Sequence, residues 1–209
     1  MSHSLTVERI LDAAELLFAE QGFSETSLRS ITSKANVNLA AVNYHFGSKK
    51  ALIQAVFSRY LDPFAENMAK ALDDFGGTGR DSDLEAALHL LVDQIMAVEP
   101  RSGDDLSVFM RLIGLAYSEA QGHLKRYLNE AYGDVFQRYF KLLVGMCPHL
   151  LAGDMFWRVN FILGSTVFTM SGANALRAIA QSDYGMNDDL EAILRKMVPF
   201  MAAGLRAHT

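Results

Sequence analysis

The sequence predicts an all-α protein. Apolar residues recur at the three- and four-residue steps of a helix through almost all of the 209 residues. No stretch alternates apolar and polar residues over the length of a strand. Residues that cap or end helices stand between the periodic stretches, and half of all residues are hydrophobic, which is enough for a substantial core. We therefore expect a three-helix N-terminal unit and a larger helical domain, with about nine helices in all.

Two helices are expected in the first 34 residues. The first should run from Thr6, which can cap its start, to Gly22, which suits its end. Its core positions on the helical period are Val7, Ile10, Leu11, Ala14, Leu17 and Phe18. The second should be short, beginning at Thr26 as its N-cap and ending near Lys34.

A four-residue turn at 35–38 should lead into a third short helix at 39–45. Asn36 tolerates the left-handed conformation that a tight turn needs, and Asn38 is a good cap for the helix that follows. Two short helices joined in this way after a first helix form a helix-turn-helix unit. Three-helix starts are common in all-α proteins, so the pattern of helices alone does not establish DNA binding. The residues on the surface of the third helix provide the further evidence.

The rest of the chain is expected to form a longer helical domain. A fourth helix should start at its cap, Ser48, and run to about Asp74, with Pro63 as a candidate kink. The clearest linker is 76–79. Further helices are expected near 82–98, 104–118, 122–146, 153–181 and 187–206. We place a DNA-binding domain at 1–50 and a ligand-binding and dimerisation domain at 51–209.

The outer surface of the third helix carries no charge. Its outward residues are Leu39, Ala40, Asn43, Tyr44 and His45. Small Ala40 and Ala41 allow close approach to a groove, Leu39 can touch a thymine methyl group, and Asn43 can bond a base edge. Because an ordinary surface helix carries Glu and Lys, this composition favours DNA binding.

The distribution of charge supports the same conclusion. The net charge of −5 by itself argues against a nucleic-acid partner. However, 26–60 holds five basic and no acidic residues, whereas the chain from residue 61 onward has a net charge of −6. A locally basic unit on an acidic body suits site-specific binding.

Two lysines begin the fourth helix, where the helix dipole is already positive. Placing Lys49 and Lys50 there costs about 0.3–1 kcal/mol each unless an anion compensates. With Ser48 and the free backbone N–H groups of the first turn, they form a candidate clamp for a DNA phosphate. The alternative is two solvated lysines.

The segments 22–31 and 44–52, with Val37 between them, resemble the signature of the TetR family of repressors over roughly residues 6–60. The resemblance implies an Ω-shaped all-α homodimer, a recognition helix at 39–45, and a ligand domain made from the remaining helices. It also implies DNA contacts from Thr26 or Ser27, from the third helix and from Lys49. The full set of expected DNA-binding residues is Thr26, Ser27, Arg29, Asn38, Leu39, Ala40, Ala41, Asn43, Tyr44, His45, Ser48, Lys49 and Lys50.

Three residues depart from the family's usual pattern. Asn36 stands where Gly is usual and Asn38 where Ser or Thr is usual, and both suit their turn and cap roles. Asn43 stands where a phosphate-binding Tyr is common, which affects the role expected of Tyr44.

The run 38–57 is similar to the PsrA-like subgroup of the family. That resemblance implies a repressor of fatty-acid metabolism genes that releases DNA when a long-chain fatty acid or acyl-CoA binds. A regulator of the efflux type, responding to another hydrophobic ligand, is the alternative. The sequence leaves open whether the protein represses or activates.

The C-terminal region is rich in large apolar residues, as expected for both a core and a pocket for a hydrophobic effector. The candidate ligand residues are Phe64, Met68, Phe109, Met110, Ile113, Tyr117, Phe136, Phe140, Trp157 and Phe161. Arg111, Arg138 or Arg158 can pair with a carboxylate head, although solvated or inter-helix roles are the more ordinary reading.

The last two helices are expected to form the interface of a homodimer. Small residues at 164, 171 and 175 lie at seven- and four-residue steps and would let another helix approach closely. A dimer is also expected from mechanism, because two recognition helices about one DNA turn apart read a palindrome in double-stranded operator DNA. The candidate interface residues are Gly164, Phe168, Ser171, Ala175, Ile193 and Met197.

Other classes of protein fit the sequence less well. The uncharged stretch 159–176 contains too many polar residues for a membrane span, no secretion signal is seen, and the single Cys147 suits the cytoplasm. For an enzyme, 77–79 lacks the rest of a dinucleotide fingerprint, and Cys147 with His149 lacks an orienting third group. We expect no catalytic residue, metal or cofactor. A helical module that binds an acidic protein partner is the other alternative.

Overall fold

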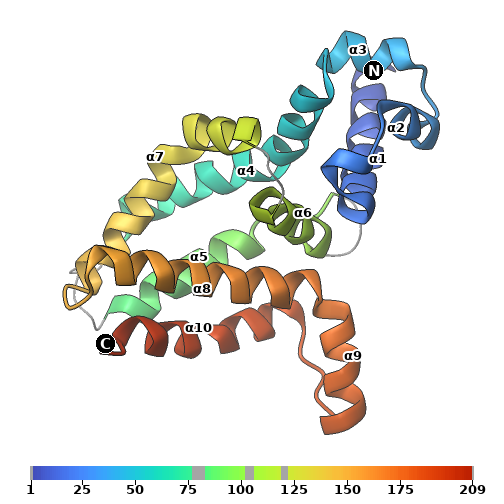
Figure 1. Ribbon diagram of the computed structural model, residues 1–209. Helices are drawn as coiled ribbons and strands as arrows, with labels where there is room; N and C mark the ends of the chain where they lie inside the picture. The colour runs from blue at the N-terminus through green and yellow to red at the C-terminus, as the bar shows by residue number, and fades with distance from the viewer. Residues whose placement is uncertain (1, 77–82, 102–105, 119–121, 209) are drawn as a thin grey trace. The chain divides into compact units, whose positions relative to one another are not determined.

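The computed structural model describes residues 2–76, 83–101, 106–118 and 122–208, and within these ranges every regular element is a helix (Figure 1). This confirms the all-α prediction. The helices are α1 (Ser2–Glu25), α2 (Leu28–Ala35), α3 (Leu39–Phe46), α4 (Lys49–Asp74), α5 (Leu84–Met96), α6 (Ser107–Ser118), α7 (Gly122–Met146), α8 (Ala152–Ser171), α9 (Ala173–Tyr184) and α10 (Leu190–Arg206).

The chain forms two compact units. The first comprises Met1–Asp62 and Glu99–Ala131, and the second comprises Pro63–Val98 and Tyr132–Thr209. Helices α4 and α7 each contribute to both units, and α4 continues through Pro63. The functional boundary expected at residue 50 stays a prediction. Of the expected linker 76–79, only Gly76 lies within the described residues.

Two expected helix starts are wrong. Helix α1 begins at Ser2 rather than Thr6, and neither proline nor glycine stands between the two positions to stop it. The N-cap of α2 is Ser27, because the hydroxyl of Thr26 donates instead to the carbonyls of Leu17 (3.1 Å) and Gly22 (2.8 Å). Near the end of α1 Gly22 adopts a φ of 84°, as its expected place at a helix end requires.

The helix expected at 153–181 is in fact two helices, which brings the number in the described ranges to ten rather than nine. The break lies at Gly172, where φ is −102° and ψ is 9°. Its N–H donates to the carbonyl of Phe168 (3.1 Å). A Ser-Gly pair is a common place for a helix to bend or end, and hydrophobic periodicity alone does not register it.

The core of the first unit is aromatic and aliphatic. Helix α6 packs along α1, and the rings of Phe18, Phe23 and Phe57 follow one another at centroid distances of 5.5 and 6.2 Å. Ile10 of α1, Ile31 of α2 and Leu52 of α4 are fully buried. Residues from α1, α2 and α4 thus hold the first unit together.

In the second unit α10 packs against α5 and α8. Its buried face consists of Leu190, Leu194, Val198, Met201, Ala202 and Leu205. Glu85 pairs with Arg206 (2.7 Å) and Asp93 with Arg195 (2.8 Å), so α5 and α10 run antiparallel. None of the described helices has both the length and the apolar character that crossing a membrane requires.

Candidate nucleic-acid interface

Local hydrogen bonds fix the turn between α2 and α3. Ser27 and Ser30 form a reciprocal capping box at the start of α2. Asn36 adopts the left-handed conformation, with φ 52° and ψ 51°, and its N–H bonds back to α2. The side chain of Asn38 accepts a hydrogen bond from the N–H of Ala41 (2.8 Å). The roles predicted for Asn36 and Asn38 are therefore confirmed.

Two basic side chains that are distant in sequence bond to backbone carbonyls of this turn and of the end of α1. The Arg9 guanidinium on α1 donates to the carbonyl of Asn36 (2.8 Å) and to that of Ala35. Lys49 Nζ donates to the carbonyl of Ser24 (3.1 Å). Sequence reasoning did not single out Arg9, although its position as the one basic residue before residue 26 was a signal.

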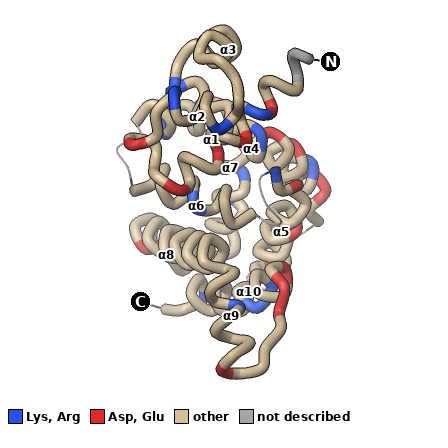
Figure 2. Tube along the Cα trace, turned by 90° about the vertical axis from the view of Figure 1, so that its right-hand side faces the viewer, with Lys and Arg blue, Asp and Glu red and all other residues tan. Residues whose placement is uncertain are grey.

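Helix α3 presents the surface that its sequence suggests. Val42 is fully buried, whereas Leu39 is 38% and Tyr44 80% exposed. The Tyr44 ring meets His45 edge-on at 5.1 Å between centroids. Ala40 and Asn43 are exposed, and Ala41 and His45 are half-buried. The tube of α3 carries no charged residue in Figure 2.

The remaining predicted DNA-binding residues lie around α3 in the first unit. Ser27, Arg29, Asn38, Ser48 and Lys50 are exposed, and Lys49 is half-buried. The Ser48 hydroxyl accepts from the N–H of Ala51 (3.1 Å), which confirms it as the cap of α4. Thr26 is fully buried, so it does not lie on the surface offered to DNA. The expected contact from Thr26 is therefore wrong, and the one expected from its exposed neighbour, Ser27, stays a prediction.

The candidate ligand residues are divided between the two units. Phe109, Met110, Ile113 and Tyr117 lie on α6 in the first unit, while Phe64, Met68, Phe136, Phe140, Trp157 and Phe161 lie in the second. Phe109 stacks on Tyr60 at 4.2 Å and is core. Phe64 and Met68 are also buried, whereas Tyr117, Trp157 and Phe161 are more than half exposed.

Two cavities occur in the second unit, along the seam of α10 with α8 and α9. One, of about 330 Å³, is lined mainly by apolar residues of the three helices, together with Arg177 of α9, Lys196 of α10 and Asp188 from the loop between these two helices. The other, of about 270 Å³, includes Phe161 and shares Phe200 with the first. Phe161 is the one candidate ligand residue that lines either of them.

Two of the three arginines considered for an effector carboxylate bond within the protein. Arg138 pairs with Asp73 at 2.5 Å. Arg158 donates to the carbonyls of Gly204 (2.8 Å) and Ala207 (2.5 Å) at the C-terminal end of α10. A cation near carbonyls at the end of a helix is favoured by the helix dipole, so Arg158 is an inter-helix residue.

The candidate interface residues lie on α8, α9 and α10. Gly164, Phe168 and Ala175 are exposed, and Ser171 is half-buried. Ile193 and Met197 are half-buried and line the larger cavity.

The comparisons with known proteins now decide the family. Residues 89–204 match the family model described as "Tetracyclin repressor-like, C-terminal domain", and residues 10–56 match "Bacterial regulatory proteins, tetR family". The first match alone covers more than half of the chain. This chain belongs to the TetR family. The predicted resemblance to TetR regulators is thereby confirmed.

A curated relative and two solved structures illustrate the likeness. The Bacillus subtilis protein named "Probable HTH-type transcriptional regulator YttP" is 31% identical over 88 residues, which are 42% of this chain and 41% of that protein. The chain therefore spans about two fifths of that relative's length. A mutant of HlyIIR has a TM-score of 0.62 at 19% identity, covering 97% of this chain and 96% of that one. The fatty acid degradation regulator FadR from Bacillus halodurans has a TM-score of 0.57 at 16% identity, covering 97% and 95%. At these identities the two structures show the fold.

Proposed function

We propose that this TetR-family chain is a transcriptional repressor that binds operator DNA through α3. The observation that carries the proposal is the acid-free, exposed outer surface of α3, held on a hydrogen-bonded turn. An α-helix fits the major groove, where base edges present distinct patterns of donors and acceptors. Asn43 is the residue of α3 best suited to reading a base, because its amide both donates and accepts.

The residues around α3 suit the DNA backbone. Arg29 and Lys50 bring positive charge to exposed positions, and Ser27 and Ser48 bring hydroxyl groups. Contacts of this kind to phosphate fix the register of a protein on the duplex without reading its sequence. Lys49 is engaged with Ser24 in the free protein, so we assign the phosphate-facing ammonium at the start of α4 chiefly to Lys50.

The repressor is proposed to act as a homodimer through α8 and α10. Trp157, Phe161, Gly164 and Phe168 recur at four-, three- and four-residue steps, so they lie on one face of α8. The three aromatic side chains are 59%, 64% and 69% exposed, and Phe200 on α10 is 65% exposed. A continuous exposed apolar face of this kind marks an interface. A second copy supplies the same face and a second α3 for a palindromic operator.

The proposed effector is a long-chain fatty acid or its coenzyme A ester. The similarity of 38–57 to the PsrA-like subgroup supports this class, and so does the likeness in fold to a structure named as a fatty acid degradation regulator. The many aromatic and methionine side chains of the second unit suit an acyl chain. The alternative is another hydrophobic ligand, as for a regulator of the efflux type.

Release of DNA tests the effector. A fluorescent duplex selected by the protein is titrated with saturated fatty acids of 8 to 18 carbons, their coenzyme A esters and the matching alcohols, and anisotropy reports bound DNA. We expect DNA release to become stronger as the acyl chain lengthens, and to require the carboxylate or thioester group that the alcohols lack. Equal response to acids and alcohols, or no dependence on chain length, would overturn the fatty-acid assignment and favour the alternative.

A further inference from the structure

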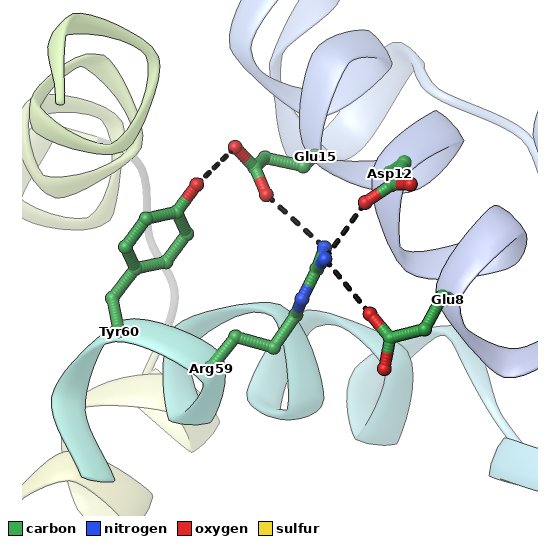
Figure 3. Close-up of polar contacts among 5 residues, drawn as sticks. All are labelled: Glu8, Asp12, Glu15, Arg59 and Tyr60. Atoms are coloured by element: carbon green, nitrogen blue, oxygen red, sulfur yellow. Dashed lines mark hydrogen bonds and ion pairs between the residues drawn. The ribbon is translucent and has the colours of Figure 1, made fainter. Parts of the chain in front are cut away.

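A partly buried charged cluster joins α1 to α4 in the first unit. Figure 3 shows Arg59 of α4 pointing at three carboxylates of α1, those of Glu8, Asp12 and Glu15, at 3.0, 2.7 and 3.3 Å. Glu15 is fully buried, and it also accepts a hydrogen bond from the Tyr60 hydroxyl. Breaking a buried ion pair by removing one partner is strongly destabilising, so this cluster fixes α4 against the helix that carries Arg9.

The Tyr60 hydroxyl is held as a donor. Burial and then the hydrogen bond to Glu15 raise the pKa of this hydroxyl well above its ordinary value. It therefore stays protonated and satisfies one oxygen of Glu15, while Arg59 bonds the other.

The ring of the same tyrosine contacts α6. Tyr60 and Phe109 stack with their centroids 4.2 Å apart and their planes 15° apart. Phe109 also meets Phe57 of α4 edge-on at 5.7 Å. Both Tyr60 and Phe109 are buried, and a closely packed interior transmits displacement rather than absorbing it. A shift of α6 therefore has to move Tyr60 or break the stack.

We propose that Phe109, Tyr60 and Glu15 are positioning residues that couple α6 to the helix-turn-helix. The path runs from the ring of Phe109 on α6 to the ring of Tyr60 on α4, and from the Tyr60 hydroxyl to the buried carboxylate of Glu15 on α1. It continues along α1 to Arg9, which donates hydrogen bonds to the carbonyls of Ala35 and Asn36. Every contact lies within the first unit. The inference rests on the proposed function, since it assigns a route by which the α6 position controls DNA binding.

A double-mutant cycle tests the coupling. Phe109→Leu removes the stacked ring, Tyr60→Phe removes only the hydroxyl, and Tyr184→Leu is the control because that ring is 76% exposed on α9. We expect Phe109→Leu alone to weaken operator binding about fivefold or more, because a looser α1 must be ordered when DNA binds. In the Tyr60→Phe background, Phe109→Leu should lower the affinity for operator DNA by less than about twofold. Tyr184→Leu should leave this affinity unchanged. Effects that simply multiply in the double variant would overturn the coupling, as would an unchanged affinity in Phe109→Leu.

Hydrogen exchange provides a second readout that needs no DNA. Amides of the 36–38 turn should exchange faster in Phe109→Leu and in Tyr60→Phe, and not faster still in the double variant. Glu15→Gln, which keeps the shape of the side chain, should behave as Tyr60→Phe does, and it replaces that variant if Tyr60→Phe fails to fold. Additive acceleration would overturn the coupling. Non-additive exchange in a protein that binds no duplex would uphold the coupling and overturn the proposed function alone.

Discussion

A few polar side chains shape the surface that we propose reads DNA. Asn36 and Asn38 were predictable, because a left-handed turn and an N-cap each require particular residue types. The N-cap of α2 is Ser27 rather than the expected Thr26. The choice depends on the carbonyl of Leu17, nine residues earlier, to which Thr26 bonds, and local propensity does not include that contact.

Ser27→Ala should lower the free energy of unfolding by about 1 kcal/mol, the usual cost of losing an N-cap. The capping box with Ser30 is lost, and the backbone N–H of Ser30 loses its acceptor. Urea unfolding measures the change. Ser33→Ala, at an exposed position of the same helix, is the control and should cost much less. Equal losses in the two variants would contradict the capping role.

Asn43→Ala and Lys50→Ala should change DNA binding in different ways. Loss of a base-reading amide relaxes discrimination at particular base pairs by about 1–3 kcal/mol. Loss of a phosphate contact instead weakens binding to all duplexes alike and lowers the slope of binding affinity against salt concentration by about one. Affinities across a set of single-base operator variants, at several salt concentrations, separate the two patterns. An Asn43→Ala profile parallel to wild type would show that Asn43 does not read bases.

Lys49→Ala is expected to combine two effects. Its ammonium already bonds the carbonyl of Ser24, so the substitution should reduce stability as well as weaken binding to all sequences alike. Comparing the melting temperature of Lys49→Ala with that of Lys50→Ala separates these effects. A wild-type melting temperature for Lys49→Ala would show that the bond to Ser24 contributes little.

At the scale of elements, periodicity located most helices but not their breaks or long-range contacts. Helices α3 and α7 were predicted to within one residue at each end, whereas the start of α1 was predicted four residues late. The break at Gly172 interrupts no apolar pattern. The contact of Arg59 with α1 joins residues 44 to 51 positions apart, and from the sequence alone Glu15 belongs to an ordinary acidic helix.

Phe161→Glu should dissociate the proposed homodimer. A charge in the centre of the exposed α8 face would be buried without a partner, and loss of a central aromatic contact commonly costs about 2 kcal/mol or more. Sedimentation equilibrium measures the dimer dissociation constant, which we expect to rise at least about 30-fold. Phe156→Glu is the matched control, because Phe156 is 56% exposed on the same helix but off this face. Equal dissociation by both variants, or by neither, would contradict the assigned face.

At the scale of the whole molecule, the fold and the family were predictable, because regular apolar faces and one compact motif encode them. The residues of the proposed effector site stay a prediction. Its candidate residues were chosen as large and apolar, and core residues share that composition. Phe109 proved to be part of the aromatic core of the first unit, while Phe161 lies on the exposed face of α8. Pocket and core differ in packing, which a single sequence does not specify.

Selection of duplexes from a random pool tests the central claim most directly. The purified protein is incubated with the pool at moderate ionic strength, bound duplexes are amplified and sequenced over several rounds, and scrambled duplexes serve as competitor. The account predicts enrichment of one palindromic sequence, with two half-sites about one helical turn apart or a near multiple. The account would be contradicted if the pool stayed random, or if scrambled duplexes competed for the protein as well as the selected duplexes do.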